Sequence, residues 1–130
     1  MLARLLEPRR IVDAHCDLPC GVYDPAQARI EAESVRAIQG KYQESNDEVF
    51  RERAVKIKEE RADLVKHHLW VLWTDYFKPE HLEVFPQLHE LFWKATKEAG
   101  DAKRSVDPEQ GKRLLSLIAE INSVFQKTKS

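Results

Sequence analysis

The sequence predicts an all-α protein, an antiparallel up-and-down four-helix bundle with an N-terminal non-helical metal-binding hook. Three observations lead to this prediction. Apolar residues recur at spacings of three and four in four separate segments, whereas no segment alternates with the period of two that strands require. Short connections join the four segments, which favours antiparallel packing of neighbours. The 130 residues suffice for one domain with a stable core.

The first helix is expected to begin at Asp24-Pro25-Ala26-Gln27, where Asp can cap the helix and Pro can occupy its first turn. The second should run from about Asn46 to about Phe77, with Pro79 beyond it. The positions expected to face the core are, in the first helix, Ala28, Glu31, Val35, Ile38 and Tyr42 and, in the second, Phe50, Ala54, Ile57, Arg61, Leu64, His68, Val71 and Asp75.

The third helix is expected from about Pro79 to Ala99, with Pro86 kinking or delaying its start and Gly100 stopping it. The fourth begins at Asp107-Pro108-Glu109-Gln110, which repeats the start signal of the first. The expected core positions are Val84, Leu88, Leu91 and Ala95 in the third helix and Leu114, Ile118, Ile121 and Phe125 in the fourth.

Composition and charge exclude several functions. The chain has 21 basic and 22 acidic residues and a formal charge of −1, whereas nucleic-acid-binding proteins usually carry a basic excess. No run of about 18 apolar residues is present, so we expect no membrane-spanning helix. We therefore expect neither a nucleic acid nor a membrane as partner.

Two charged residues interrupt the apolar repeats, Glu31 in the first helix and Arg61 in the second. A buried charge without a partner costs several kcal/mol. The two residues are therefore either a pair between these helices or two solvated charges at the edges of their apolar faces, and the pattern alone does not decide between them.

Residues 1–14, MLARLLEPRRIVDA, are interpreted as a leader that is removed by cleavage after Ala14. Glu7, Pro8 and two arginines split its apolar residues, so it lacks the continuous stretch of about 7–15 apolar residues that an export signal needs. An ordinary frayed terminus is the alternative. Without an export signal, we expect a cytoplasmic protein whose domain spans residues 15–130.

The only two cysteines, Cys16 and Cys20, lie close together in the hook, residues 15–23. They could form a local disulfide, a redox pair or a metal site. If the chain begins at His15, its α-amine, the amide nitrogen of Cys16 and the two thiolates can form a square of two nitrogens and two sulfurs, with the His15 ring as an axial ligand. Such surroundings suit nickel(II) or copper(II), whereas zinc prefers a tetrahedron.

Residues 15–25, HCDLPCGVYDP, resemble the nickel-binding hook of nickel-containing superoxide dismutases at eleven consecutive positions. The resemblance extends over residues 15–130, including segments 26–42 and 70–78. It implies a four-helix bundle, a homohexamer with the hooks inside, and one nickel ion per subunit. It also implies a precursor that a leader peptidase cuts before the histidine.

The resemblance assigns the metal ligands by position. His15 supplies its α-amine and ring, Cys16 its amide nitrogen and thiolate, and Cys20 its thiolate. Pro19 is expected to be cis and to fix the turn of the hook.

The resemblance also assigns the residues around the metal. Tyr23 should stand near the open axial face, with Asp17 holding its hydroxyl. Glu31 should hydrogen-bond the His15 ring, and Arg61 should hold Glu31. Such outer partners orient a ligand and adjust its basicity.

The function implied by the resemblance is superoxide disproportionation to dioxygen and hydrogen peroxide, with nickel cycling between Ni(II) and Ni(III). Superoxide is an anion, so nearby lysines could steer it, with Lys66 and Lys78 as candidates. The alternative is a non-catalytic bundle whose CxxxC hook binds zinc or forms a disulfide and docks a partner. A thiol oxidoreductase is less favoured, because its usual motif is CxxC next to a βαβ unit.

Overall fold

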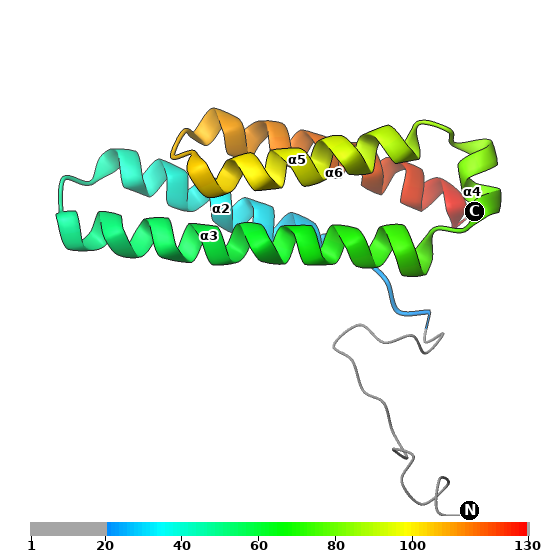
Figure 1. The fold of residues 1–130 in the computed structure, drawn as a ribbon, viewed down its shortest axis with the longest axis horizontal. Helices are drawn as coiled ribbons and strands as arrows, with labels where there is room; N and C mark the ends of the chain where they lie inside the picture. Colours follow the sequence, from blue (N-terminus) through cyan, green and yellow to red (C-terminus); the bar gives the residue numbers. More distant parts are fainter. Residues whose placement is uncertain (1–20, 130) are drawn as a thin grey trace, which may run out of the picture.

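The structure, a computed structural model, describes residues 21–129. Four long helices form the bundle that the sequence predicts, and a short helix lies between the second and the third (Figure 1). The long helices are α2 (Ala26–Glu44), α3 (Glu48–Val71), α5 (Leu88–Arg104) and α6 (Pro108–Thr128). A π-helical turn, η1 (Leu72–Tyr76), extends α3, and the short helix is α4 (Pro79–Val84). No helix within residues 21–129 has the length and apolar character needed to cross a membrane.

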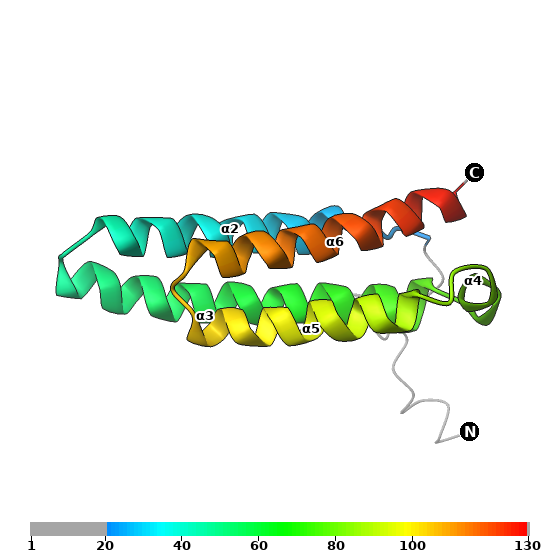
Figure 2. The ribbon, with the colours of Figure 1, turned by 90° about the horizontal axis from the view of Figure 1, so that it is seen from above.

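The long helices form two layers, with α2 beside α6 and α3 beside α5 (Figure 2). Consecutive long helices also pack on each other, so that all four enclose a single core. The start of α2, η1, α4 and the end of α6 lie toward one end of the bundle, here called the α4 end (Figure 1). The α2–α3 and α5–α6 connections lie toward the opposite end.

Aspartates begin the helices much as the sequence predicts. Asp47 and Asp107 cap α3 and α6, and each accepts a hydrogen bond from the amide two residues later. At α2 the N-cap is Pro25 rather than the expected Asp24. The Asp24 carboxylate instead accepts from the Ala26 amide at 2.9 Å, one residue outside the cap.

The third predicted helix is in fact two helices. Pro86 lies in the break between α4 and α5, because it has no amide hydrogen with which to continue a helix. Gly100 does not stop α5, which continues to Arg104. A Cβ at Gly100 would lie 3.2 Å from the Lys66 ammonium of α3, so this glycine leaves room for the end of the Lys66 side chain.

The buried faces agree with the predicted repeats in α6 but not in α3. Leu114, Ile118, Ile121 and Phe125 are all buried, as expected. In α3 the buried positions are Ala54, Lys58, Ala62, Val65 and Leu69, largely one residue beyond the predicted ones. Small buried alanines on α2 and α3 allow these helices to approach closely, so bulky residues such as Phe50 and Leu64 fall on the exposed side.

Lys58 lies in the core face of α3 although it is charged. Only 1% of its surface is exposed, and its ammonium donates to the carbonyls of Ala102 and Lys103 at 2.6 and 2.8 Å. These carbonyls belong to the last turn of α5, where the helix dipole favours a cation. Lys58 therefore ties α3 to the C-terminal end of α5.

A second buried polar contact joins the helices of the other layer. The Gln39 side-chain amide of α2 donates to the Gln110 side chain of α6 at 2.8 Å, and Gln110 donates to the Glu98 carbonyl of α5 at 2.7 Å. Gly111 faces Gln39, and a Cβ there would clash with the Gln39 oxygen. These contacts fix how α2, α5 and α6 are aligned along their axes.

Replacing Lys58 with Met should destabilise the protein. The variant leaves the two carbonyls without their buried donor, which should lower the free energy of unfolding by about 1–3 kcal/mol. Urea denaturation of the full chain, followed by circular dichroism, measures the change. Lys56→Met, at an exposed position of the same helix, is the control and should change the stability by less than about 0.5 kcal/mol.

The same comparison should depend on pH. Burial lowers the pKa of Lys58 below its ordinary value of 10.5, although the neighbouring Glu59 opposes this shift. Between the lowered pKa and 10.5 the unfolded chain binds more protons than the folded chain, so the free energy of unfolding rises with pH across this window. Below the lowered pKa the penalty for burying the ammonium is present in full and reduces, without abolishing, the contribution of Lys58. The stability difference between wild type and Lys58→Met should therefore grow with alkaline pH, and a pH-independent difference would contradict this account.

Candidate metal centre

The predicted metal ligands His15, Cys16 and Cys20, together with Asp17 and Pro19, lie outside the described residues. Tyr23, Glu31, Arg61, Lys66 and Lys78 lie within them. Across residues 21–129, no group of three or more His, Cys, Asp or Glu side chains is arranged to hold a metal. The structure therefore describes residues that are expected to surround the metal, but not the predicted ligands themselves.

Gly21, which directly follows Cys20, adopts a left-handed backbone conformation with φ of +72°. Among residues 21–129, no atom lies within 4 Å of the position that a Cβ would take there. The positive φ is thus the reason for a glycine at this position. The left-handed residue turns the chain between the predicted ligand Cys20 and the start of α2.

Tyr23 packs against Tyr76 at the α4 end, with their ring centroids 5.7 Å apart and their planes tilted by 57°. Both side chains are partly buried against the core. Tyr76 is the last residue of η1, where the Phe77 amide donates to the Leu72 carbonyl, five residues back, at 3.0 Å. The widened turn thus brings Tyr76 to the entry of α2, beside the tyrosine expected near the open axial face of the metal.

Other aromatic and cationic groups enclose the Tyr76 ring. It lies 4.6 Å from the Phe125 ring and is stacked on His81 at 5.8 Å, and the Lys129 ammonium lies 5.3 Å from its centroid. The sequence analysis did not single out Tyr76. The signal that could have found it is antiparallel packing, which places the end of the second helix beside the beginning of the first.

Glu31 and Arg61 form the predicted pair between the first two long helices. The Arg61 guanidinium lies 3.2 and 3.4 Å from the two carboxylate oxygens of Glu31. The Glu31 side chain is 17% exposed and that of Arg61 is 41% exposed. The pair is confirmed, and the alternative of two separate solvated charges is wrong.

The two candidate steering lysines lie in different places. Lys78 is exposed and follows Tyr76 by two residues, at the N-cap of α4. Lys66 packs on Gly100 of α5, ten residues before Tyr76 and hence about 15 Å back along α3. Of these two candidates, Lys78 is the one that lies at the α4 end with the two tyrosines.

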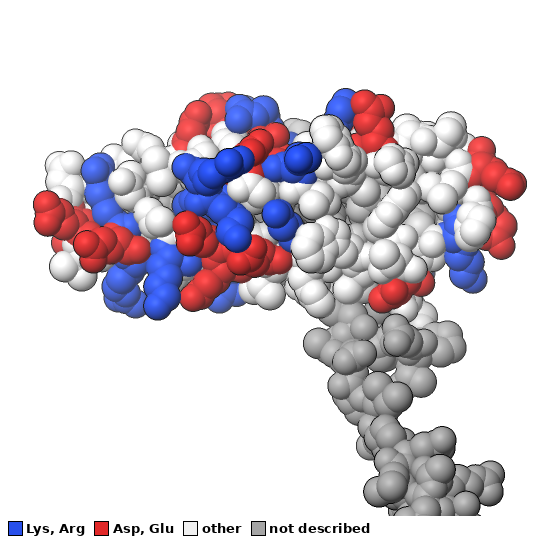
Figure 3. Space-filling model, in the orientation of Figure 1, with Lys and Arg blue, Asp and Glu red and all other residues white. Residues whose placement is uncertain are grey.

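Charge is unevenly distributed over the face shown in Figure 3. Charged side chains gather over the part of the bundle near the α2–α3 connection, whereas the part of α3 and α5 nearer α4 shows few charges. Trp70 and Trp93, 51% and 57% exposed, line a groove of about 200 Å³ between these two helices. The two exposed indoles thus belong to one aromatic groove, and the Lys97 ammonium lies 5.5 Å from the centroid of the Trp93 ring.

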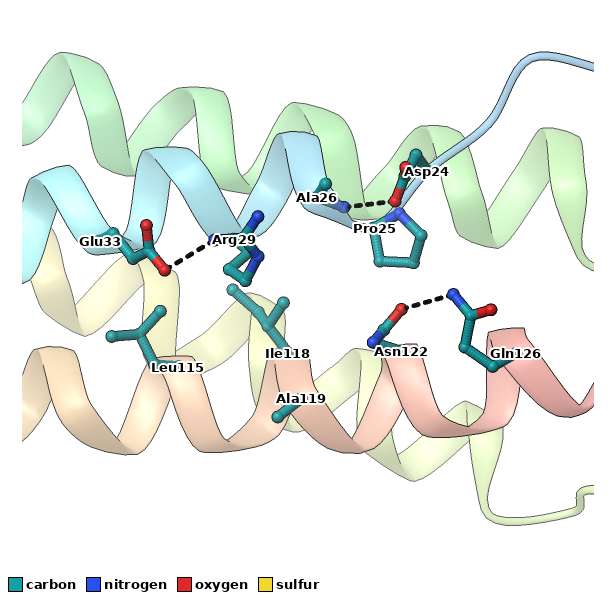
Figure 4. A pocket seen from close by; sticks show the side chains of 10 residues that line it. All are labelled: Asp24, Pro25, Ala26, Arg29, Glu33, Leu115, Ile118, Ala119, Asn122 and Gln126. Carbon is teal, nitrogen blue, oxygen red and sulfur yellow. Dashed lines mark hydrogen bonds and ion pairs between the residues drawn. The ribbon is translucent and has the colours of Figure 1, made fainter.

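A groove of about 460 Å³ runs between α2 and α6 beside the helix start (Figure 4). Its polar side chains pair along their own helices: Arg29 binds Glu33 at 2.7 Å on α2, and Gln126 donates to Asn122 at 3.2 Å on α6. None of Tyr23, Glu31 and Arg61 lines it. The groove is therefore separate from the surroundings described above.

Known proteins resemble this chain over nearly its whole length. The family model for nickel-containing superoxide dismutase matches residues 10–129. The superoxide dismutase [Ni] of Streptomyces seoulensis is 58% identical and that of Streptomyces coelicolor 56%, each over 129 residues, 99% of this chain and 98% of the relative. A native crystal structure of nickel superoxide dismutase matches with a TM-score of 0.87 and 56% identity, and one with oxidised-state nickel ligation with 0.87 and 59%. Each covers 88% of this chain and 98% of its own.

The Glu31–Arg61 pair should act as one unit in folding. Glu31→Gln and Arg61→Gln each leave a partly buried charge without its partner, so the double variant should cost less than the sum of the single variants, by about 0.5–1.5 kcal/mol. Urea denaturation of the four proteins gives this coupling energy.

The exposed pair Arg29–Glu33 on α2 provides the matched control, with side chains 50% and 53% exposed. The corresponding Gln variants should be additive to within about 0.5 kcal/mol. Additive costs at Glu31 and Arg61 as well would show that their contact contributes nothing to stability.

Proposed function

The chain belongs to the nickel-containing superoxide dismutase family, and we propose that His15, Cys16 and Cys20 bind its nickel ion. The enzyme converts two superoxide anions and two protons into dioxygen and hydrogen peroxide. One superoxide loses an electron, and the other gains an electron and two protons. Bound nickel supplies this one-electron chemistry by alternating between Ni(II) and Ni(III). The observation that carries the function is 58% identity to a nickel superoxide dismutase over nearly the full chain, which decides against the non-catalytic alternative.

The donor set of the hook fits nickel. Its two thiolates, one amide nitrogen, one α-amine and one imidazole lie within six residues. Strongly donating nitrogen and sulfur ligands in a plane suit nickel(II), and anionic donors stabilise a higher oxidation state. Cys16 and Cys20 are the only thiols of the chain, so no other thiolates can supply this set.

We assign Glu31 to orienting the His15 ring and Arg61 to holding Glu31. The contact between Glu31 and Arg61 supports this assignment, because a carboxylate fixed by a guanidinium can accept a ring N–H in a defined direction. Glu31 lies six residues after Pro25, about 9 Å along the helix axis, whereas the nine residues from His15 to Tyr23, with eight steps between them, can span up to about 26 Å. The hook is therefore long enough to fold back to Glu31.

We assign Tyr23 to the side of the metal where superoxide approaches, with Asp17 holding its hydroxyl. The packing of Tyr23 on Tyr76 supports this assignment, because it fixes the ring next to the hook. Tyr76 joins the proposed site through this contact. Lys78, exposed nearby, is the better placed of the two lysines to attract an anion.

We also propose a homohexamer acting in the cytoplasm, formed after residues 1–14 are removed by a peptidase. The exposed indoles of Trp70 and Trp93 support assembly, because a contact between subunits would bury them. The extent of the matches supports the cleavage. The match to the curated sequences covers 99% of this chain, whereas the match to the solved structures covers 88%. The difference is comparable in length to residues 1–14.

The active chain should begin at His15. Any preceding residue converts the α-amine into a peptide nitrogen and removes one ligand, so the chain that retains Met1 should show no dismutase activity after nickel loading. A chain beginning at Ala14 is the matched control and should be equally inactive, because a single residue suffices to block the amine. Mass spectrometry identifies each N-terminus, and full activity with Met1 retained would refute the proposal.

Cys16→Ser and Cys20→Ser should each abolish nickel binding and activity while the bundle stays helical. The thiolates hold the metal, whereas apolar side chains within residues 21–129 form the core of the bundle. Metal analysis, a superoxide assay and circular dichroism on each variant separate the two effects. Retained nickel in either variant would remove that cysteine from the proposed ligand set.

A further inference from the structure

The Thr128 hydroxyl, at the end of α6, contacts two groups at once. Its oxygen lies 2.6 Å from the Tyr76 hydroxyl oxygen and 2.6 Å from the Phe125 carbonyl oxygen. Thr128 thus connects the end of the last helix to the tyrosine that packs on Tyr23. The direction of the two hydrogen bonds follows from which atoms can donate.

A threonine hydroxyl has one hydrogen to donate, and a carbonyl can only accept. In a continuing α-helix the Phe125 carbonyl would accept from the amide of residue 129. The helix ends here, however, and the Lys129 amide donates to the Gln126 carbonyl instead. The Thr128 hydroxyl takes over the Phe125 carbonyl, as side chains commonly do at helix ends. The hydrogen between Thr128 and Tyr76 must then come from Tyr76.

The same turn of α6 holds the ring as well as the hydroxyl of Tyr76. The Phe125 ring lies 4.6 Å from the Tyr76 ring, and the Lys129 ammonium lies near the centroids of both rings, at 5.0 Å from Phe125 and 5.3 Å from Tyr76. The ring therefore has little freedom to turn its hydroxyl away from Thr128. Tyr76 keeps lone pairs for accepting a further hydrogen bond, but its one hydrogen is committed.

We infer that Thr128 is a positioning residue for the dismutase reaction. It receives the hydroxyl hydrogen of Tyr76 and so makes Tyr76 an acceptor, not a proton donor, beside Tyr23. Formation of hydrogen peroxide needs two protons, and this arrangement excludes Tyr76 as their immediate source. The inference rests on the proposed function, because Tyr76 matters to the reaction only if Tyr23 faces the metal.

Three variants test the inference: Thr128→Val removes the acceptor at similar volume, Thr128→Ser keeps it, and Tyr76→Phe removes the donor. Ultraviolet resonance Raman spectra of the metal-free protein report whether a tyrosine donates its hydrogen, and the difference between wild type and Tyr76→Phe isolates the signal of Tyr76. The donor signature should be lost in Thr128→Val and retained in Thr128→Ser. An unchanged signature in Thr128→Val would overturn the inference.

Turnover of the nickel-loaded proteins tests the connection to the reaction. The Thr128→Val variant should turn over superoxide more slowly, by less than about tenfold. Groups that touch a metal ligand directly typically account for about 10- to 100-fold, and the effect of Thr128 should be smaller because it acts through Tyr76. Thr128→Ser should restore turnover. In the Tyr76→Phe background, Thr128→Val should change nothing further, because Thr128 acts through Tyr76. A further loss in that background would show a merely structural role and overturn the inference.

Two controls separate this inference from the proposed function. Ser123→Val removes an exposed hydroxyl from the same helix and should alter neither the spectrum nor the turnover. Nickel content is measured for every protein. A wild-type chain beginning at His15 that binds no nickel would refute the proposed hook, whereas the Raman result on metal-free protein would still decide the hydrogen bond between Tyr76 and Thr128.

Discussion

The close antiparallel packing of α2 against α3 brings about the two contacts on which the described part of the proposed site depends. Small buried residues on both helices, among them Ala28, Ala32 and Ala62, let the two backbones approach. Because the helices run in opposite directions, the beginning of α2 meets the end of α3. Tyr23 then meets Tyr76. Glu31, eight residues after Tyr23, meets Arg61, fifteen residues before Tyr76. Neither contact would form if one helix shifted by a turn along the other.

The two ends of the bundle serve different purposes. Buried polar contacts, from Lys58 to the last turn of α5 and from Gln39 to Gln110, hold the helices in register toward the end remote from α4. Such contacts add little net stability but penalise misaligned packing, because each misalignment leaves a buried polar group without its partner. The α4 end is held by aromatic rings instead. It therefore places Tyr23 and Tyr76 together at the start of α2, which follows the proposed metal-binding segment in the sequence.

The sequence predicted the helices well and their buried faces less well. The apolar repeat of α6 was sufficient to predict its buried face, because large apolar residues occupy its core positions. In α3 the apolar repeat placed the buried face one residue too early. Lys58 and two alanines occupy the core face of this helix, whereas Phe50 and Leu64 are exposed. Pro86 was recognised as a disturbance, but only packing shows that it separates two helices. Two misplaced charges made the Glu31–Arg61 pair one of two alternatives, and the family resemblance favoured it. The position of Tyr76, in contrast, depends on a π-helical turn that no residue pattern predicted.

That π-helical turn makes the position of Tyr76 sensitive to chain length. An α-helical turn from Leu72 would close one residue earlier than the observed bond to the Phe77 amide. The wide turn takes up one residue more than an α-helical turn would. If the same residues closed an ordinary α-helical turn, Tyr76 would be displaced by one helical position, roughly 100° about the axis. The Tyr76 ring would then leave both Tyr23 and the end of α6. The position of Tyr76 thus depends on the wide turn and on the number of residues within it together, although the turn lies outside the proposed metal-binding motif.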